Sequence, residues 1–442
     1  MAGNIRVSVI GLGKLGSPLL AVLGNSGFEA VGVDLNKSCV DQINSRIAPV
    51  FEPRLQEYIA NENSKIRATA DYEEAIVESD LTFIIVPTPS NADGSFSNEY
   101  VLSAVREISK ALKRKKTYHV INITSTVMPG SCDGEIRKAI EKYSDRHVGR
   151  DVGLCYNPEF IALGSVIKNM EYPDMCLIGQ SDENAGNMLA QIYTRICKNN
   201  PKLMRMSLVN AEITKIAVNT FVTTKISYAN MLSDLCARIP GASALEVCEA
   251  IGMDSRIGQK YIKPGPAFGG PCFPRDNQAF IRMAKSLGAC FDLATATKDI
   301  NDYQTIRLVS IIESISVNKW VGFIGASYKS GTPIIEESAA TNAIDVLLGK
   351  GIKVCVYDEF AEDNLRAKYG DKVAIMSGVA DLVYKSHTIV STLERGSILI
   401  DDNAHALRGL DVKNYIDCWG GDSRSMIENL GLKYYSLAIG VN

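Results

Sequence analysis

Along the first part of the chain, short β-rich runs alternate with helical stretches. The predicted strands lie at residues 5–10, 28–34, 80–86, 118–123, 152–155 and 175–179, and the predicted helices include 17–24 and 97–112. Such an alternation of strands and helices is typical of a parallel sheet that is covered by helices. We therefore predict a doubly wound α/β domain over residues 1–204.

A long helical pattern follows this region. Residues 206–239 keep a helical period of apolar positions, with no Pro or Gly until Pro240. Such a helix is about 50 Å long at a rise of about 1.5 Å per residue, which is longer than one domain usually needs. Helices of this length often span domains or support a dimer. A second helical stretch at 294–316 leads out of the region, and we predict a central helical domain over residues 205–318.

The last part of the chain repeats features of the first. Residues 320–325 (WVGFIG) resemble the first strand and its glycine, a later strand ends at Asp358, and 386–392 echoes 79–89. These parallels predict a second domain over residues 319–442, related to the first by a weak internal repeat. The expected fold is α/β, with two Rossmann-like doubly wound domains joined by a central all-helical domain that contains a long helix.

Composition excludes several classes of function. Among 442 residues, 47 Lys and Arg nearly balance 50 Asp and Glu, so no excess charge favours binding to nucleic acid or to an anionic membrane. No apolar run is long enough to predict a membrane span, and the N-terminus lacks the pattern of a signal peptide. The eleven cysteines are scattered without a CxxC pair, which favours reduced thiols, a cytoplasmic location and no structural metal.

The first predicted strand runs directly into a glycine motif, GLGKLG at 11–16. Its glycines permit a tight turn and let backbone N–H groups approach a pyrophosphate at the N-terminus of the next helix. An acidic residue at the end of the second strand, about 20 residues later, accepts hydrogen bonds from a ribose 2′-OH and repels a 2′-phosphate. We therefore predict binding of NAD, in preference to NADP, by Gly11, Gly13, Lys14, Leu15, Gly16 and Asp34.

Two further loops are candidates for the cofactor site, because loops at the carboxyl ends of strands line the ligand crevice of a doubly wound sheet. Pro87 and Thr88 follow one strand, and Ser125 and Thr126 follow the next. These residues are candidates to contact the nicotinamide half of the cofactor, with ordinary capped turns as the alternative. The last domain lacks the glycine motif, so we expect no second dinucleotide there. Lys329 and its loop are candidates for a nucleotide or phosphate, with a solvated loop as the alternative.

The clearest chemical signal lies in the Gly/Pro-rich loop 263–276 of the central region. Cys272 lies there beside Arg275 and Asp276, shortly before a helix predicted over 277–287. A positive neighbour and a helix N-terminus favour the thiolate form that a nucleophile requires. An incidental loop cysteine is the alternative.

Lys215 and Asn219 lie four residues apart and therefore share one face of the long helix. An ammonium beside an amide can stabilise a developing oxyanion or hold a water molecule. An exposed lysine next to a polar residue is the commoner situation and remains the alternative.

The motifs together resemble those of a known family. GLGKLG, VPTP, STVMPG, NPEF, AEITKIAVN, AFGGPCFPRD and GASYK occur in the order found in the UDP-glucose/GDP-mannose dehydrogenase family and cover nearly the whole chain. The resemblance implies an NAD domain, a central helical dimerisation domain and a C-terminal sugar-nucleotide domain. It also implies oxidation of a sugar C6 alcohol to a carboxylate by two successive hydride transfers in a homodimer, with UDP-glucose as the favoured substrate.

The resemblance further implies roles for individual residues. Cys272 resembles the thiol that captures the aldehyde as a thiohemiacetal, which is then oxidised to a thioester. Lys215 and Asn219 resemble the pair that stabilises the oxyanion. Asp276 resembles a residue that positions or activates water, Glu159 the carboxylate of thioester hydrolysis, and Thr126 a hydroxyl near the nicotinamide and the substrate. Arg275 is expected at the cofactor, and the expected substrate-binding residues are Phe160, Lys215, Asn219, Tyr261, Phe268, Gly269 and Lys329.

Two positions depart from the family pattern. Leu163 stands where many UDP-glucose enzymes have a Glu, and Glu336 belongs to a segment that replaces the usual Asp-x-Arg, whose Arg often engages the substrate. These departures leave GDP-mannose open as the substrate. The CFPRD form of the cysteine motif favours UDP-glucose over UDP-N-acetylhexosamines.

Two other classes of protein stay open. One is a two-electron dehydrogenase of the 6-phosphogluconate or 3-hydroxyacid type, which shares the Lys-x-x-x-Asn pair. Cys272 and the third domain argue against it. The other is a non-catalytic regulatory protein that binds NAD or a nucleotide, and the intact Lys215, Asn219, Cys272 and Asp276 argue against that class.

Overall fold

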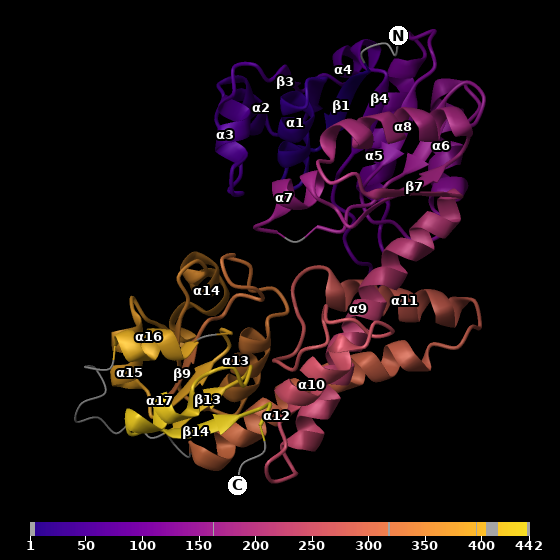
Figure 1. Cartoon of the computed structure of the whole chain (residues 1–442). Coiled ribbons are helices and arrows are strands. Elements are labelled where there is room, and N and C mark those ends of the chain that lie inside the picture. The colour runs from indigo at the N-terminus through magenta and orange to yellow at the C-terminus, as the bar shows by residue number, and fades with distance from the viewer. Residues whose placement is uncertain (1–4, 162, 317–318, 395, 404–413, 440–442) are drawn as a thin grey trace. The chain divides into compact units, whose positions relative to one another are not determined.

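The computed structural model describes residues 5–161, 163–316, 319–394, 396–403 and 414–439 (Figure 1). The chain forms two compact units, Met1–Ala217 and Val218–Asn442. The division falls within helix α9 (Leu208–Cys236). The division into three domains stays a prediction, and its boundary after residue 318 adjoins residues 317–318, which lie outside the described residues.

The first unit is built on an eight-stranded sheet with the order β3-β2-β1-β4-β5-β6-β7-β8. Its strands are β1 (Arg6–Ile10), β2 (Glu29–Val33), β3 (Ile66–Thr69), β4 (Leu81–Ile84), β5 (Val120–Ile123), β6 (Gly153–Tyr156), β7 (Met175–Gln180) and β8 (Lys202–Met206). Neighbours from β3 to β6 run parallel, whereas β7 pairs antiparallel with β6 and parallel with β8. The sheet is thus mixed at one edge, which is common in sheets that are otherwise parallel.

Helices cover both faces of this sheet, because successive strand residues point to opposite faces. In β5, for example, Val120 packs in one core cluster, whereas Ile121 and Ile123 pack in the other. The first cluster takes residues from α1, α2, α3, α7 and α8, and the second takes residues from α4, α5, η1, α6 and the start of α9. The helices are α1 (Gly16–Asn25), α2 (Lys37–Asn44), α3 (Leu55–Ala60), α4 (Tyr72–Glu78), α5 (Glu99–Leu112), η1 (Cys132–Ile136), α6 (Arg137–Ser144), α7 (Val166–Glu171) and α8 (Glu183–Ile196).

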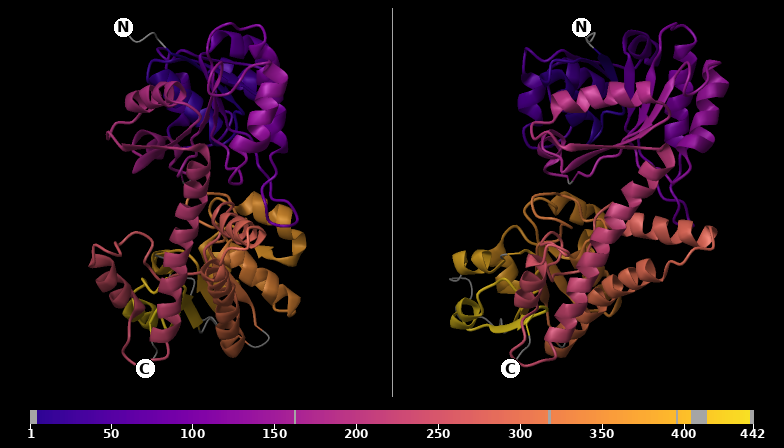
Figure 2. Two further views of the ribbon diagram at one scale, coloured as in Figure 1. Left: turned by 90° about the vertical axis from the view of Figure 1, so that its right-hand side faces the viewer. Right: turned by 45° about the vertical axis from the view of Figure 1, so that its right-hand side comes forward.

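The helical region predicted after the first sheet is present. Figure 2 shows α9 as a long helix, and it is followed by α10 (Ala244–Met253), α11 (Phe273–Ser286) and α12 (Asp292–Ile315). The long helix is shorter than the predicted range 206–239. Met206 pairs with Gly179 as the last residue of β8 and so cannot begin the helix. At the other end, the residue before Pro240 is disfavoured in the α conformation, and the chain turns there.

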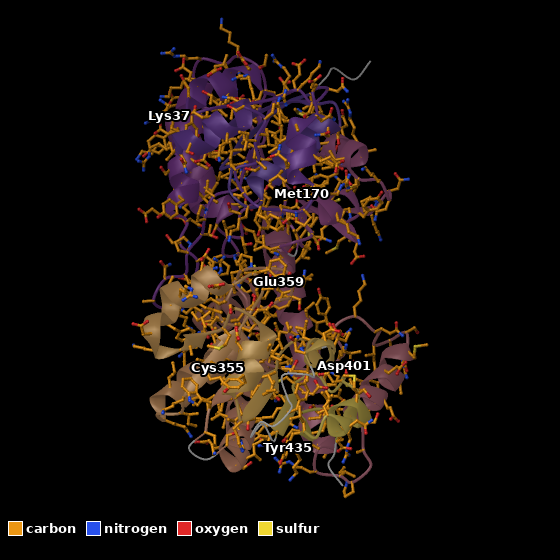
Figure 3. The ribbon with its side chains drawn as sticks, turned by 90° about the vertical axis from the view of Figure 1, so that its left-hand side faces the viewer. Lys37, Met170, Cys355, Glu359, Asp401 and Tyr435 are labelled. Carbon is orange, nitrogen blue, oxygen red and sulfur yellow. The ribbon has the colours of Figure 1, made fainter. Side chains whose placement is uncertain are left out.

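The second unit also contains a six-stranded, entirely parallel sheet with the order β11-β10-β9-β12-β13-β14. Counted along the chain, this order repeats that of β1 to β6, which confirms the second Rossmann-like fold. The elements are β9 (Val321–Ile324), α13 (Ala339–Gly349), β10 (Val354–Tyr357), α14 (Glu362–Tyr369), η2 (Gly370–Lys372), β11 (Ala374–Ile375), α15 (Val379–Lys385), β12 (Thr388–Ser391), α16 (Gly396–Asp402), β13 (Asn414–Asp417), α17 (Arg424–Asn429) and β14 (Lys433–Ser436). Cys355 of β10, labelled in Figure 3, is fully buried in this domain's core.

Candidate active site

The turn between β1 and α1 forms a cradle for a ligand. Gly11 has φ +91°, in the left-handed region that favours glycine, and a Cβ there would strike the loop after β4. A Cβ on Gly16 would strike the Gly11 carbonyl, so this glycine lets α1 begin directly at the turn. A Cβ on Gly13 would meet nothing within 4 Å, so the backbone at this position borders open space that a ligand can enter. Leu15 is the N-cap residue of α1, where backbone N–H groups and the helix dipole favour an anion.

Asp34 follows β2 and lies against this turn. Its Oδ2 accepts a hydrogen bond from the Leu12 N–H at 2.7 Å, and its Oδ1 accepts one from the Asn36 N–H at 2.8 Å. The glycine cradle, the helix N-terminus and the carboxylate together fit the pyrophosphate and ribose of a dinucleotide. Lys37, labelled in Figure 3, is exposed at the start of α2.

The loops after β1, β4, β5 and β6 are neighbours, because these strands lie side by side in the sheet. Ser125 joins two of the loops: its hydroxyl accepts from the Val86 N–H at 2.9 Å and donates to the Val86 carbonyl at 2.7 Å. The Ser125 hydroxyl therefore has a structural role that the sequence did not reveal. Thr88 is buried, Pro87 is exposed and Thr126 is half-buried. Contact of these residues with the cofactor stays a prediction.

Glu159 follows β6 and is held by two residues of the first unit. The Tyr193 hydroxyl oxygen lies 2.9 Å from Glu159 Oε1 and 2.5 Å from Asn157 Oδ1, so a single proton serves two acceptors. Burial raises the pKa of the Glu159 carboxyl, and the Tyr193 hydroxyl and the Lys215 ammonium offset part of that rise. Tyr193 was not among the residues predicted from the sequence, where it is one of several apolar positions on a helix.

Lys215 lies beside the same segment. Its Nζ donates to the Glu159 carbonyl at 2.8 Å and lies 4.7 Å from the centre of the Phe160 ring. The side chain is buried, so this lysine is not the exposed helix residue that was the alternative. Leu163, where relatives often have a Glu, packs against the core cluster on the α1 side of the sheet.

In the second unit, Cys272 is exposed and forms the N-cap of α11. The helix begins at Phe273, four residues before the predicted start at residue 277. The predicted start was wrong, because proline is tolerated in the first turn of a helix and Pro274 lies in that turn. Arg275 and Asp276 therefore lie in the first turn, and the thiol stands directly at the helix N-terminus, a setting that favours a thiolate.

Asp276 and Asn219 are in direct contact. Asn219 Nδ2 donates to Asp276 Oδ2 at 2.6 Å, and both side chains are buried. The Asp276 N–H also donates to the Cys272 carbonyl at 2.8 Å, in the first turn of α11. The structure thus brings together three of the predicted catalytic residues in the second unit.

Two asparagines that the sequence analysis missed hold the loop before Cys272. Asn301 of α12 accepts from the Phe268 N–H at 2.7 Å and donates to the Phe268 carbonyl at 3.1 Å. Asn230 of α9 accepts from the Gly265 N–H at 2.9 Å. Both asparagines are far from the loop in sequence, and spacing alone gives no signal for them.

The same loop packs against the segment that follows β9. A Cβ on Gly269 would strike the Glu337 carbonyl, and the Gly270 N–H donates to the Glu336 carbonyl at 3.1 Å. The Glu336 side chain, at the place of the usual Asp-x-Arg, is exposed.

The remaining predicted substrate residues of the second unit are aromatic or basic. Tyr261 and Phe268 both make edge-on ring contacts with Phe273, at centroid distances of 6.3 Å and 6.4 Å. Lys329 is exposed. Their contact with a substrate stays a prediction.

The predicted site residues therefore form two groups, one in each unit, and α9 carries a member of each group. Lys215 belongs to the first unit with Thr126 and Glu159, and Asn219 belongs to the second with Cys272. In the described parts of the chain, no cluster of His, Cys, Asp or Glu has the make-up of a metal site. None of the described helices combines the length and the apolar character that a membrane span requires.

Comparison with known sequences supplies the family. Residues 5–197 match the NAD binding domain of the UDP-glucose/GDP-mannose dehydrogenase family, residues 209–303 match its central domain, and residues 322–414 match its UDP binding domain. The chain belongs to this family.

The proteins that are similar to this chain are named for different substrates. The UDP-glucose 6-dehydrogenase AglM of Haloferax volcanii is 33% identical over 91% of this chain and 95% of its own length. A GDP-mannose 6-dehydrogenase of Pseudomonas syringae pv. syringae is also 33% identical, over 81% of this chain and 82% of its own length. The UDP-glucose dehydrogenase structure from Pyrobaculum islandicum superposes with a TM-score of 0.87 at 28% identity, covering 100% of this chain and 99% of that one. This chain is thus an NAD-binding member of the nucleotide-sugar dehydrogenases.

Proposed function

We propose that this protein oxidises the C6 alcohol of a nucleotide sugar to a uronate in two successive two-electron steps, with UDP-glucose as the substrate. The observation that carries this proposal is the exposed Cys272 at the N-cap of α11, with the Asn219–Asp276 pair in the first turn of the same helix. A plain alcohol dehydrogenase needs no nucleophile, whereas oxidation of an aldehyde to an acid requires a tetrahedral adduct.

The first oxidation requires a base and an oriented alcohol. NAD, when bound at the glycine turn, supplies the hydride acceptor for each of the two oxidations. Lys215 is buried beside Phe160, where its side chain can hold a water molecule or the developing alkoxide of the substrate. The C6 carbon gives up its hydride, and the hydroxyl proton passes to the water molecule held by Lys215, so that an aldehyde is left.

The second oxidation requires covalent catalysis by Cys272. The thiolate sulfur forms a bond to the aldehyde carbon, and the carbonyl oxygen becomes an alkoxide that takes up a proton as the thiohemiacetal. The amide of Asn219 and the ammonium of Lys215 stabilise negative charge on that oxygen. The adduct then gives up a second hydride and passes its hydroxyl proton to water, which converts it to a thioester.

Hydrolysis releases the acid. Water adds to the thioester carbon, the carbon–sulfur bond breaks, and the thiolate of Cys272 is restored. Asp276 is placed to orient water through its contact with Asn219. Glu159 is a second carboxylate for this step, and the burial that raises its pKa suits a general base or acid.

The choice of UDP-glucose rests on three observations. AglM, a UDP-glucose 6-dehydrogenase, is similar over more of this chain than the GDP-mannose enzyme is. The similar structure from Pyrobaculum islandicum is also a UDP-glucose dehydrogenase. In addition, the cysteine motif has the CFPRD form. GDP-mannose is the second candidate, because a GDP-mannose 6-dehydrogenase has the same 33% identity to this chain.

One experiment decides both the reaction and the substrate. Purified protein is incubated with NAD and, in turn, UDP-glucose, UDP-galactose, UDP-GlcNAc, UDP-ManNAc or GDP-mannose, and NADH and uronate are measured. We expect two NADH for each UDP-glucose consumed, with no free aldehyde. One NADH per sugar would move the protein to the two-electron class, and preference for GDP-mannose would overturn the substrate.

We also propose that the protein is a homodimer. Several apolar side chains of α9 are exposed to solvent. Phe221 is 65% exposed and Leu235 is 54% exposed, and Tyr228 and Met231, which lie between them in sequence, are also exposed. Exposed apolar stripes of this kind often mark protein–protein contacts. Light scattering with Phe221→Asp and Leu235→Asp should show monomers where the wild type is a dimer, and a monomeric wild type would contradict the proposal.

A further inference from the structure

Glu212 is a buried carboxylate on α9 that the proposed reaction does not use. Its side chain is 0% exposed. Its Oε2 accepts a hydrogen bond from the Gly130 N–H at 2.6 Å, and its Oε1 accepts one from the Cys132 N–H at 2.8 Å. A buried carboxylate is costly unless its oxygens are satisfied, and these two backbone donors satisfy one oxygen each.

The two donors belong to the loop that follows β5. This loop carries Thr126, and its last donor, Cys132, begins the helical segment η1. Val127 of this loop and Ala211 of α9 are both buried in the core cluster on this side of the sheet. Glu212 therefore attaches the loop to the start of α9 through two hydrogen bonds.

The attachment joins two parts of the proposed reaction centre. Lys215 lies three residues after Glu212 on α9, and Thr126 lies four residues before Gly130 on the loop. We infer that Glu212 is a positioning residue that fixes the Thr126 loop against the turn of α9 that carries Lys215. This inference rests on the proposed function, in which both residues lie at the reacting atoms.

The geometry requires a carboxylate of this length. A glutamine at this position keeps one acceptor oxygen but turns an NH2 group toward the second backbone N–H, so that two donors face each other. An aspartate keeps both acceptors but is one methylene shorter and cannot reach both N–H groups. Burial raises the pKa of the Glu212 carboxyl, and the two N–H donors oppose that rise by favouring the ionised form.

The first test is the kinetics of Glu212→Gln. A misplacement of about 1 Å at a reacting group costs up to about a hundredfold in rate, so we expect kcat to fall by about tenfold to a hundredfold. The KM for NAD should change by no more than about threefold, because the glycine turn is held by contacts of its own, such as the hydrogen bond from the Leu12 N–H to Asp34. Retention of wild-type kcat would overturn the inference.

A matched control separates positioning from general loss of stability. Glu171 is 3% exposed and is also a buried carboxylate: its Oε1 accepts from the Tyr58 hydroxyl at 2.5 Å and pairs with Lys198 at 2.6 Å. It contacts neither the Thr126 loop nor α9 in these interactions. Glu171→Gln should lower the melting temperature yet keep kcat within about twofold at 25 °C. An equal fall of kcat in both variants would show that Glu212 acts only through stability.

A double-mutant cycle tests whether Glu212 acts through Thr126. Thr126→Ala and Glu212→Gln should not be additive: the double variant should have a kcat within about twofold of the poorer single variant, because the residue that Glu212 positions is already gone. Multiplication of the two losses would refute the connection to Thr126.

Amide hydrogen exchange gives a readout that does not depend on activity. In Glu212→Gln, exchange at Gly130 and Cys132 should become at least about tenfold faster, with little change in β5. Unchanged exchange would overturn the attachment itself. If the wild type made no NADH from any nucleotide sugar, the proposed function would fail, and with it the catalytic part of this inference. An active wild type with an equally active Glu212→Gln variant refutes this inference alone.

Discussion

Replacement of Tyr193 by Phe tests the carboxylate that we assign to thioester hydrolysis. Tyr193 is buried on α8, and its hydroxyl is shared between Glu159 Oε1 and Asn157 Oδ1. Phenylalanine keeps the ring in its place and removes the hydroxyl donor. The perturbation therefore reaches Glu159 without a change in its charge or in the neighbouring Lys215.

The magnitude follows from the value of that hydrogen bond. A hydrogen bond to a charged group is worth about 1.5–3 kcal/mol, and the lower value applies here because one proton serves two acceptors. One pKa unit corresponds to about 1.4 kcal/mol. The donor lowers a pKa that burial has raised, so its loss lets the pKa of Glu159 rise further. The fall of kcat at acidic pH (the acid limb) should therefore move to higher pH by about one unit. At pH values above this fall, kcat should change little.

The assay is a pH–rate profile of NADH formation from about pH 5 to pH 9, for the wild type and for Tyr193→Phe. Tyr172→Phe is the matched control, because Tyr172 is 51% exposed and lies just after α7. The same change of side chain there should leave the limb in place. An unchanged limb in Tyr193→Phe, or an equal shift in Tyr172→Phe, would refute the assignment of the limb to Glu159.

Three further predictions concern the chemistry. Cys272→Ser should lower turnover by about a thousandfold or more and leave a trapped sugar adduct that intact-protein mass spectrometry can detect. Cys272→Ala should form no adduct. Uronate production at a normal rate by the Ala variant would show that the thiol has only a structural role. Lys215→Ala should lower kcat by about a hundredfold or more with nearly unchanged NAD affinity, measured by steady-state kinetics and fluorescence titration; near-normal turnover would remove Lys215 from the reaction. NAD should be strongly preferred to NADP in kcat/KM, because the Asp34 carboxylate repels a 2′-phosphate. Equal efficiency with both cofactors would contradict that role of Asp34. The exposed Lys37 would then be the residue to test for offsetting the repulsion.

Much of the fold could be predicted from hydrophobic patterning, because the strands with the clearest patterns are central and buried. β1, β4 and β5 lie side by side in the middle of the first sheet, and their apolar runs stand out. The edge strands β3 and β8 were missed. β3 alternates between buried and half-buried positions over four residues, and no residue of β8 is fully buried. A short edge strand that shows one face to solvent carries little periodic signal.

Members of the candidate site could be proposed from the sequence where residue type and motif coincide, and not where tertiary contact alone places a residue. Cys272 and the glycine turn belong to compact motifs with a local physical reason. Tyr193, Asn301 and Glu212 act on segments that lie far away in sequence, through hydrogen bonds that only the folded chain creates. No spacing rule connects α8 or α12 with the loops that these residues hold.

The internal repeat shows why similar folds need not bind similar ligands. Both Rossmann-like domains place an aspartate after the second strand, and in both an oxygen of that aspartate accepts from backbone N–H groups of the first turn. Asp34 accepts from two N–H groups, which leaves about half of a carboxylate's four acceptor sites for ribose hydroxyls. Asp358 accepts from four, those of Ala326, Ser327, Phe360 and Ala361. Its acceptor capacity is therefore used within the fold, so the second copy keeps the turn but lacks the free carboxylate oxygen that would recognise a second dinucleotide.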